Sequence, residues 1–65
     1  MKDIMINQMG MVKMFTQAGR KQDAQDTLNN FGKIMVEMAE DKYMIEQKPN
    51  FEAFVKFAQA QIDLI

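Results

Sequence analysis

The sequence predicts an all-α protein with three helices in an up-down-up arrangement that is completed by oligomerisation. Apolar residues recur at helical spacing along most of the chain, and only Gly19 and Pro49 mark clear breaks. Two short connections between helices favour antiparallel neighbours. The 65 residues are expected to form a single helical domain, residues 1–65. Because so small a domain buries only about 60% of the surface of its unfolded chain, association is expected to add stability.

The first helix is expected over residues 2–18. Its apolar side follows spacings of seven, four and three and comprises Ile4, Met11, Phe15 and Ala18. Gly19 comes next, where helix ends favour a residue that adopts positive φ. Asp23 is then expected either to cap the second helix or, with Asp26, to place negative charge in its first turn.

The seven residues around this glycine carry one local resemblance. The segment from Ala18 to Ala24 reads Ala-Gly-Arg-Lys-Gln-Asp-Ala and resembles the junction between the two helices of a tetratricopeptide repeat. The resemblance implies a helical hairpin at this point of the chain. It implies no function.

The second helix, expected over residues 23–44, has the clearest periodicity in the chain. Its apolar stripe alternates spacings of four and three and comprises Ala24, Leu28, Phe31, Met35 and Met38. The opposite face is polar and is expected to be solvated. This helix is therefore predicted to be the spine of the fold.

Pro49 is expected to end helical geometry at the residue before it, which predicts a loop over residues 45–50. Asn50 is then expected to cap a third helix over residues 51–65. Under this assignment Pro49 and Phe54 occupy the two positions of a hydrophobic staple.

The third helix is expected to be apolar on all but a narrow strip. One lane is predicted to line the core and comprises Phe51, Phe54, Val55, Ala58, Ile62 and Ile65. A second lane beside it comprises Ala53, Phe57, Ala60 and Leu64. A single chain this short offers no internal surface for both lanes, so self-association is predicted, most simply as a dimer. The residues predicted to carry it are Phe54, Phe57, Ala60, Gln61 and Leu64.

The composition argues against catalysis and against several partners. The chain contains neither histidine nor cysteine, so it lacks the commonest general base and the best unassisted nucleophile, and no enzyme activity, cofactor or metal site is predicted. Eight basic residues against nine acidic ones give a net charge of −1, which disfavours nucleic acid as a partner. No apolar run approaches the roughly 18 residues of a membrane span. A cytoplasmic location is expected, in the host cytoplasm if the chain is phage-encoded.

Other side chains are candidates for contact with a partner. Eight methionines suit either core packing, which we favour, or an adaptable binding face. Met9, Val36 and Tyr43 point away from the predicted stripes and are candidate partner contacts. Gln8 and Gln61 fall within apolar faces, where they either pair across a symmetric interface or lie at its wet edge.

The function predicted from these features is that of a small non-enzymatic helical protein that self-associates and regulates or inhibits another protein by binding it. A phage or mobile-element accessory factor is the context that such a chain suggests. One alternative is a nucleic-acid-binding dimer that uses Lys13, Arg20, Lys21 and Lys33, the first three being candidate phosphate contacts. Another is capture of a small anionic ligand or nucleotide at an oligomer interface.

Overall fold

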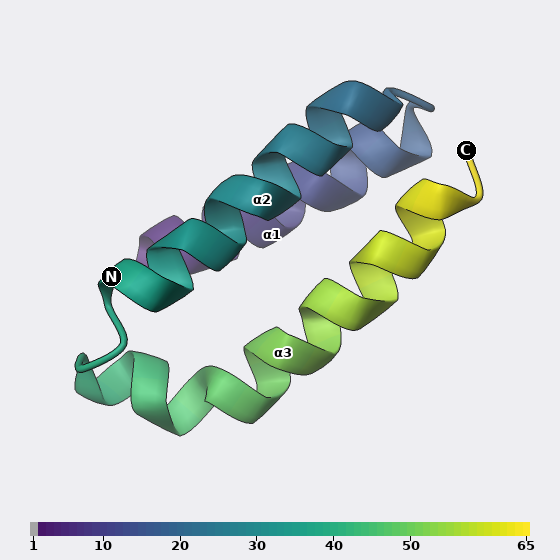
Figure 1. Cartoon of the computed structure of the whole chain (residues 1–65). Coiled ribbons are helices and arrows are strands. Elements are labelled where there is room, and N and C mark those ends of the chain that lie inside the picture. Colours follow the sequence, from purple (N-terminus) through teal and green to yellow (C-terminus); the bar gives the residue numbers. More distant parts are fainter. Residues whose placement is uncertain (1) are drawn as a thin grey trace.

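A computed structural model describes residues 2–65 and shows three helices, α1 (Lys2–Gln17), α2 (Lys21–Glu37) and α3 (Lys42–Asp63). They run up, down and up, so that α1 and α3 point the same way (Figure 1). Residues 2–65 contain no strand, and the predicted all-α three-helix fold is confirmed. None of these helices combines the length and the apolar character that a bilayer span requires. Packing is most extensive between α1 and α2 and least extensive between α1 and α3.

The turn between α1 and α2 is the predicted helical hairpin. Gly19 has a φ of 73°, in the left-handed region that glycine adopts without steric cost. The backbone N–H of Arg20 donates to the carbonyl of Phe15 at 2.9 Å, which satisfies a carbonyl that α1 would otherwise leave unpaired. A residue with a Cβ at position 19 would therefore strain the turn.

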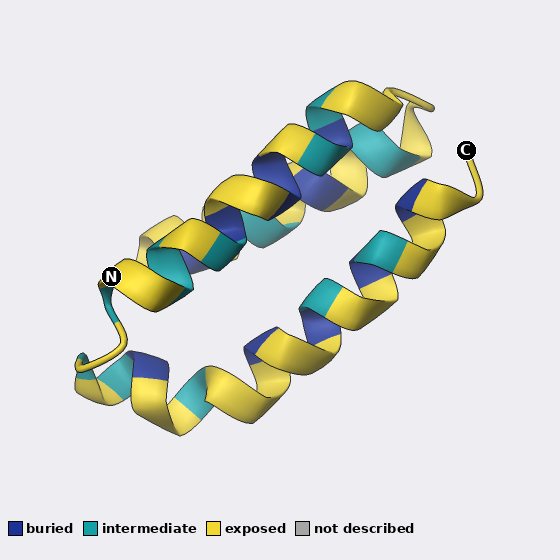
Figure 2. Cartoon of the chain, in the orientation of Figure 1, coloured by how far each residue is buried: buried dark blue, intermediate teal, exposed yellow. Residues whose placement is uncertain are grey.

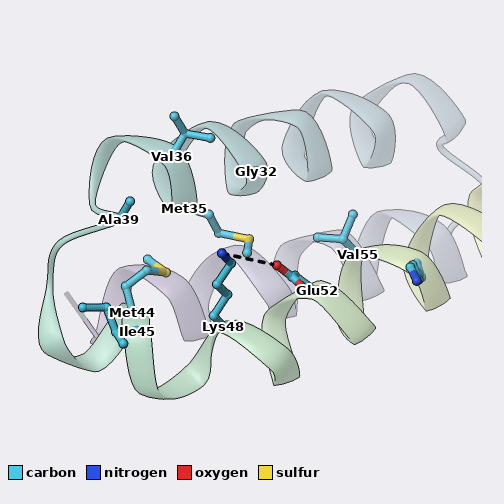
Figure 3. Close-up of a pocket in the computed structure, with 10 residues that line it drawn as sticks. Gly32, Met35, Val36, Ala39, Met44, Ile45, Lys48, Glu52 and Val55 are labelled. Carbon is cyan, nitrogen blue, oxygen red and sulfur yellow. Dashed lines mark ion pairs between the residues drawn. The ribbon is translucent and has the colours of Figure 1, made fainter.

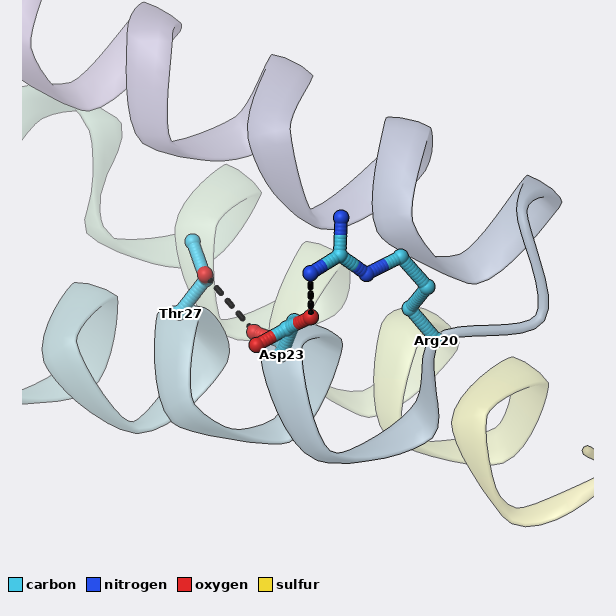
Figure 4. Close-up of polar contacts among 3 residues, drawn as sticks. All are labelled: Arg20, Asp23 and Thr27. Atoms are coloured by element: carbon cyan, nitrogen blue, oxygen red, sulfur yellow. Dashed lines mark hydrogen bonds and ion pairs between the residues drawn. The ribbon is translucent and has the colours of Figure 1, made fainter.

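Asp23 lies inside the first turn of α2 rather than at its N-cap, because α2 already begins at Lys21. Its carboxylate forms an ion pair with Arg20, and the Thr27 hydroxyl donates to its backbone carbonyl at 2.8 Å (Figure 4). Of the two predictions for Asp23, its place in an acidic first turn is the one confirmed, whereas Asp26 lies beyond that turn. Such a charge is favourable at the positive end of the helix dipole.

The boundary between α2 and α3 was predicted wrongly. The sequence predicted a helix over 23–44 and a loop over 45–50, whereas α2 ends at Glu37 and α3 begins at Lys42. Asp41 is the N-cap of α3, and its side chain accepts a hydrogen bond from the backbone N–H of Met44 at 3.2 Å. Because α2 ends earlier than predicted, the chain turns back before Met44, and the Met44 side chain is buried in the core. A helix continuing to residue 44 would carry that side chain away from the other two helices.

Pro49 does not break the chain, which corrects the predicted loop, the Asn50 cap and the staple. It is the eighth residue of α3, and its side chain is exposed. Since proline has no N–H, the carbonyl of Ile45 loses its usual helical partner. Figure 1 shows α3 changing direction after its first turns, as expected beside an internal proline. Asn50 is a helical residue whose amide donates to Gln47 at 2.9 Å.

The buried residues lie on the sides of the three helices that face one another (Figure 2). They are aromatic and aliphatic residues that form one core cluster. Phe31 of α2 is fully buried, and its ring meets the rings of Phe51 and Phe54 edge-on at centroid distances of 5.4 and 5.3 Å. Tyr43 adds a third edge-on contact, at 5.9 Å from Phe51. The predicted α2 stripe is confirmed, since three of its residues are buried and the two methionines are half-buried against the core.

The predicted core side of α1 was largely wrong. Met5 and Val12 are buried, whereas the predicted Ile4, Met11 and Ala18 are exposed and Phe15 is half-buried. The true core side is rotated by roughly a quarter turn from the predicted one. Apolar residues occupy nearly every side of α1, so their spacing alone does not single out one face.

Candidate interaction surfaces

The first candidate surface is the second lane predicted for the third helix, which we call the α3 outer lane. It comprises Ala53, Phe57 and Ala60 of α3 and Leu64, the C-cap residue that follows the helix with helical backbone angles. All four residues are exposed in the protomer, and the side chains of Phe57 and Leu64 are 64% and 81% exposed. Figure 2 shows the exposed side of α3 turned away from the other two helices. The protomer therefore covers one lane of α3 and leaves the other open to solvent.

Of the residues that neighbour the outer lane, some belong to the core and others are exposed. Phe54 was predicted to take part in self-association, but it is only 9% exposed and belongs to the core, where its ring contacts Phe31. Gln61 is exposed beside the outer lane, where it remains available for an intermolecular contact. Val55 and Ile65 were predicted to lie in the core lane, and they are half-buried and exposed respectively.

A shallow groove of about 310 Å³ lies between α1 and α3 at the edge of the outer lane. Phe57 and Gln61 border it from α3, and Lys13 and Gln17 border it from α1. The groove exists because α1 packs mainly on α2 and only lightly on α3. Phe57 therefore borders both the outer lane and this groove.

The second candidate surface is a larger groove of about 530 Å³ between α2 and α3, which we call the α2–α3 groove (Figure 3). Its apolar lining residues are Gly32, Met35, Val36, Ala39, Met44, Ile45 and Val55. Val36 and Ile45 are 77% and 59% exposed. Charged side chains line only the α3 wall, where Lys48 forms a weak ion pair with Glu52 at 3.9 Å and Lys56 lies one turn beyond.

The three predicted partner contacts lie in different surroundings. Val36 is exposed in the α2–α3 groove, as a partner contact requires. Met9 and Tyr43 are half-buried and pack against the core, so they are poor candidates. Ile45 was missed because it fell within the predicted loop. The signal that would have revealed it is Asp41, a favoured N-cap residue four positions earlier.

A pair of side-chain amides joins α2 to α3. The side-chain amides of Gln25 and Gln59 exchange two hydrogen bonds, at 2.9 and 2.7 Å, and both residues are half-buried. Their remaining N–H groups donate to Asn29 and Asp63. This pair differs from the glutamines singled out in the sequence, Gln8 and Gln61, whose two alternatives concern an interface between copies. Gln8 is half-buried and accepts a hydrogen bond from Asn30 at 3.3 Å.

The candidate phosphate contacts do not form a cluster of basic side chains that is free of ion pairs with acidic residues. Lys13, Arg20 and Lys21 are all exposed. Arg20 forms an ion pair with Asp23 (Figure 4). Its guanidinium also lies 5.2 Å from the centre of the Phe15 ring. Lys33, the fourth cation of the nucleic-acid alternative, pairs with Glu37 at 3.9 Å. Within residues 2–65 no group of histidine, cysteine or acidic side chains could hold a metal ion.

Comparison of the chain with protein-family models, curated proteins and solved structures finds no match.

Proposed function

We propose that the chain is a small non-enzymatic interaction protein that forms a homodimer through the α3 outer lane and binds another protein as a regulator or inhibitor. The observation that carries the proposal is the exposure of Phe57 and Leu64, two turns apart on one side of α3. Large apolar side chains aligned on one helix face are typical of helix–helix interfaces. A cytoplasmic setting and a phage or mobile-element context remain part of this proposal.

Self-association is supported by the size of the protomer. A chain of 65 residues has a small core for its surface, and its buried residues already use the inner lane of α3. Transfer of Phe57 and Leu64 from water into an interface is favourable by about 25 cal/mol for each Å² of apolar surface. Pairing two copies therefore adds apolar burial that one chain lacks.

Replacing both Phe57 and Leu64 with aspartate is expected to convert the dimer into a single chain. Two carboxylates would have to be buried without partners in each copy, and such burial costs more than the interface gains. The measurement is mass in solution, by light scattering during size-exclusion chromatography. Circular dichroism should show unchanged helix content, because both side chains face solvent in the protomer.

A matched control replaces Val36 and Ile45 with aspartate. These residues are also large, apolar and exposed, but they lie in the α2–α3 groove rather than on the outer lane. This variant should keep the dimer mass. If the Phe57 and Leu64 variant also keeps it, self-association through the outer lane is wrong.

For the other protein we propose the α2–α3 groove, which the outer lane leaves open. Its two apolar walls come from neighbouring helices, as in grooves that accept a single amphipathic helix. Lys48 stands on the α3 wall and is held only by a weak pair with Glu52. The occupant that fits is therefore an amphipathic helix with acidic residues along one edge.

A synthetic helix with leucines at positions i, i+3, i+4 and i+7 and glutamates along one edge tests this occupant. Saturable binding is expected by isothermal titration, and the Val36 and Ile45 double aspartate variant should abolish it. A peptide with lysines in place of the glutamates should bind at least about tenfold more weakly. Equal binding of both peptides, or binding unaffected by the groove variant, would exclude this partner chemistry.

A further inference from the structure

Small and large side chains alternate along the α3 outer lane. Ala53 and Ala60 are small, whereas Phe57 and Leu64 are large, and all four are exposed. Their spacings of four, three and four keep them on one side of the helix. Helices pack closely where a large side chain of one faces a small side chain of the other. The alternation therefore limits how two copies of this lane can meet.

We infer that the second copy packs its own α3 antiparallel to the first, about a two-fold axis that passes midway between Phe57 and Ala60. This inference rests on the self-association proposed above. In this register Phe57 faces Ala60 of the second copy, and Leu64 faces Ala53 of the second copy. Both pairs have the same midpoint along α3, so one axis places a large residue opposite a small one at every position of the lane. Such an interface is closed, because each copy offers the same surface.

A parallel pair in register would match the same lane poorly. Phe57 would face Phe57 and Leu64 would face Leu64, which holds the helices apart. The alanines would then face each other across a gap. A parallel pair shifted by one turn restores the alternation but leaves part of each lane uncovered, and it does not close. The antiparallel register is the one that fills the whole lane.

The charges beside the lane support the same register. Lys56 and Asp63 immediately precede Phe57 and Leu64, so they border the lane on the same side. Neither takes part in an ion pair within residues 2–65, although Asp63 accepts a hydrogen bond from Gln59 at 2.9 Å. Antiparallel pairing brings Lys56 of each copy beside Asp63 of the other, and charges that flank helix–helix seams pair in this way. The two-fold axis forms this contact twice.

Cysteine cross-linking tests the orientation directly, because the native chain has no cysteine. Two single variants, Ala53→Cys and Leu64→Cys, are oxidised separately and as a mixture. In the antiparallel dimer, copies of the same cysteine lie about 17 Å apart along α3, beyond the Cα separation of about 4.4–6.8 Å that a disulfide needs. Cross-linked dimer is therefore expected from the mixture alone. Both positions are exposed in the protomer, so the fold should be unaffected.

Each other outcome has a distinct meaning. Cross-linking of each single variant with itself would show a parallel dimer and overturn the inference, while self-association would stand. A dimer mass without any cross-link would overturn the antiparallel register alone. A single-chain mass for the native protein would overturn both the register and the proposed function.

A charge exchange gives a second readout of the register. Lys56→Asp and Asp63→Lys should each weaken self-association by about tenfold, because each places like charges together twice. The variant that carries both changes should recover native self-association, since the charges then pair in reverse. Failure of the combined variant to recover it, after the single changes have weakened it, would overturn the proposed contact.

Discussion

Replacing Phe31 with alanine is expected to leave little folded protein at 25 °C. Phe31 is fully buried between Phe51 and Phe54, and among residues 2–65 its ring is the only one that contacts both. Truncating a buried phenylalanine to alanine typically costs about 3–5 kcal/mol, through lost burial and the cavity that remains. The whole stability expected for a domain of this size is about 3–10 kcal/mol. One substitution would therefore remove much or all of it.

Urea unfolding followed by circular dichroism at 222 nm measures this effect. The native chain should show a cooperative transition, and Phe31→Ala should show a transition at much lower urea or none. Phe57→Ala is the matched control, because it removes the same atoms from a mostly exposed position. Measured at a concentration too low for self-association, it should change stability by less than about 0.5 kcal/mol. Equal effects of the two substitutions would contradict the buried position of Phe31.

Periodicity predicted α2 well because its polar and apolar residues are separated around the helix. Ala24, Leu28 and Phe31 lie on one side and are buried, while Asn29 and Lys33 lie on the other and are exposed. In α1 the same method failed, because Ile4, Met5, Met11 and Val12 occupy different sides. Packing against the other two helices decides that Met5 and Val12 face inward. The buried side of α1 is therefore set by tertiary contacts and not by the spacing of its apolar residues.

Of the two candidate surfaces, the sequence predicted one and missed the other. The α3 outer lane was predicted because, within residues 51–65, the polar positions lie mainly on one strip, formed by Glu52, Lys56, Gln59 and Asp63. The α2–α3 groove was not predicted, because it requires α3 to start at Lys42 and to return along α2. The helix start was predicted after Pro49, at the Asn50 cap, and Asp41, a favoured N-cap residue that starts α3 in the structure, was overlooked. Burial of Met44 and Phe51 on either side of Pro49 favours a continuous helix.

Replacing Pro49 with alanine is expected to stabilise the protein by about 1–3 kcal/mol. Alanine restores the N–H that the carbonyl of Ile45 lacks, and proline inside a helix costs about 3 kcal/mol relative to alanine. The greater freedom of the unfolded chain offsets up to about 1 kcal/mol of this gain. Pro49 is exposed, so its removal leaves no cavity. Thermal unfolding should show a melting temperature higher by about 5–15 °C.

Asn50→Ala and Asp41→Ala are the matched controls, and they separate the two possible starts of α3. In this structure Asn50 is an exposed residue in the middle of the helix, so alanine there should be neutral or slightly stabilising. Asp41 caps the helix through the backbone N–H of Met44, so alanine there should cost about 1 kcal/mol. The opposite pattern, with Asn50→Ala and Pro49→Ala both destabilising and Asp41→Ala neutral, would place the helix start after the proline. Since the α2–α3 groove needs the first two turns of α3, that pattern would also remove the surface proposed for the partner helix.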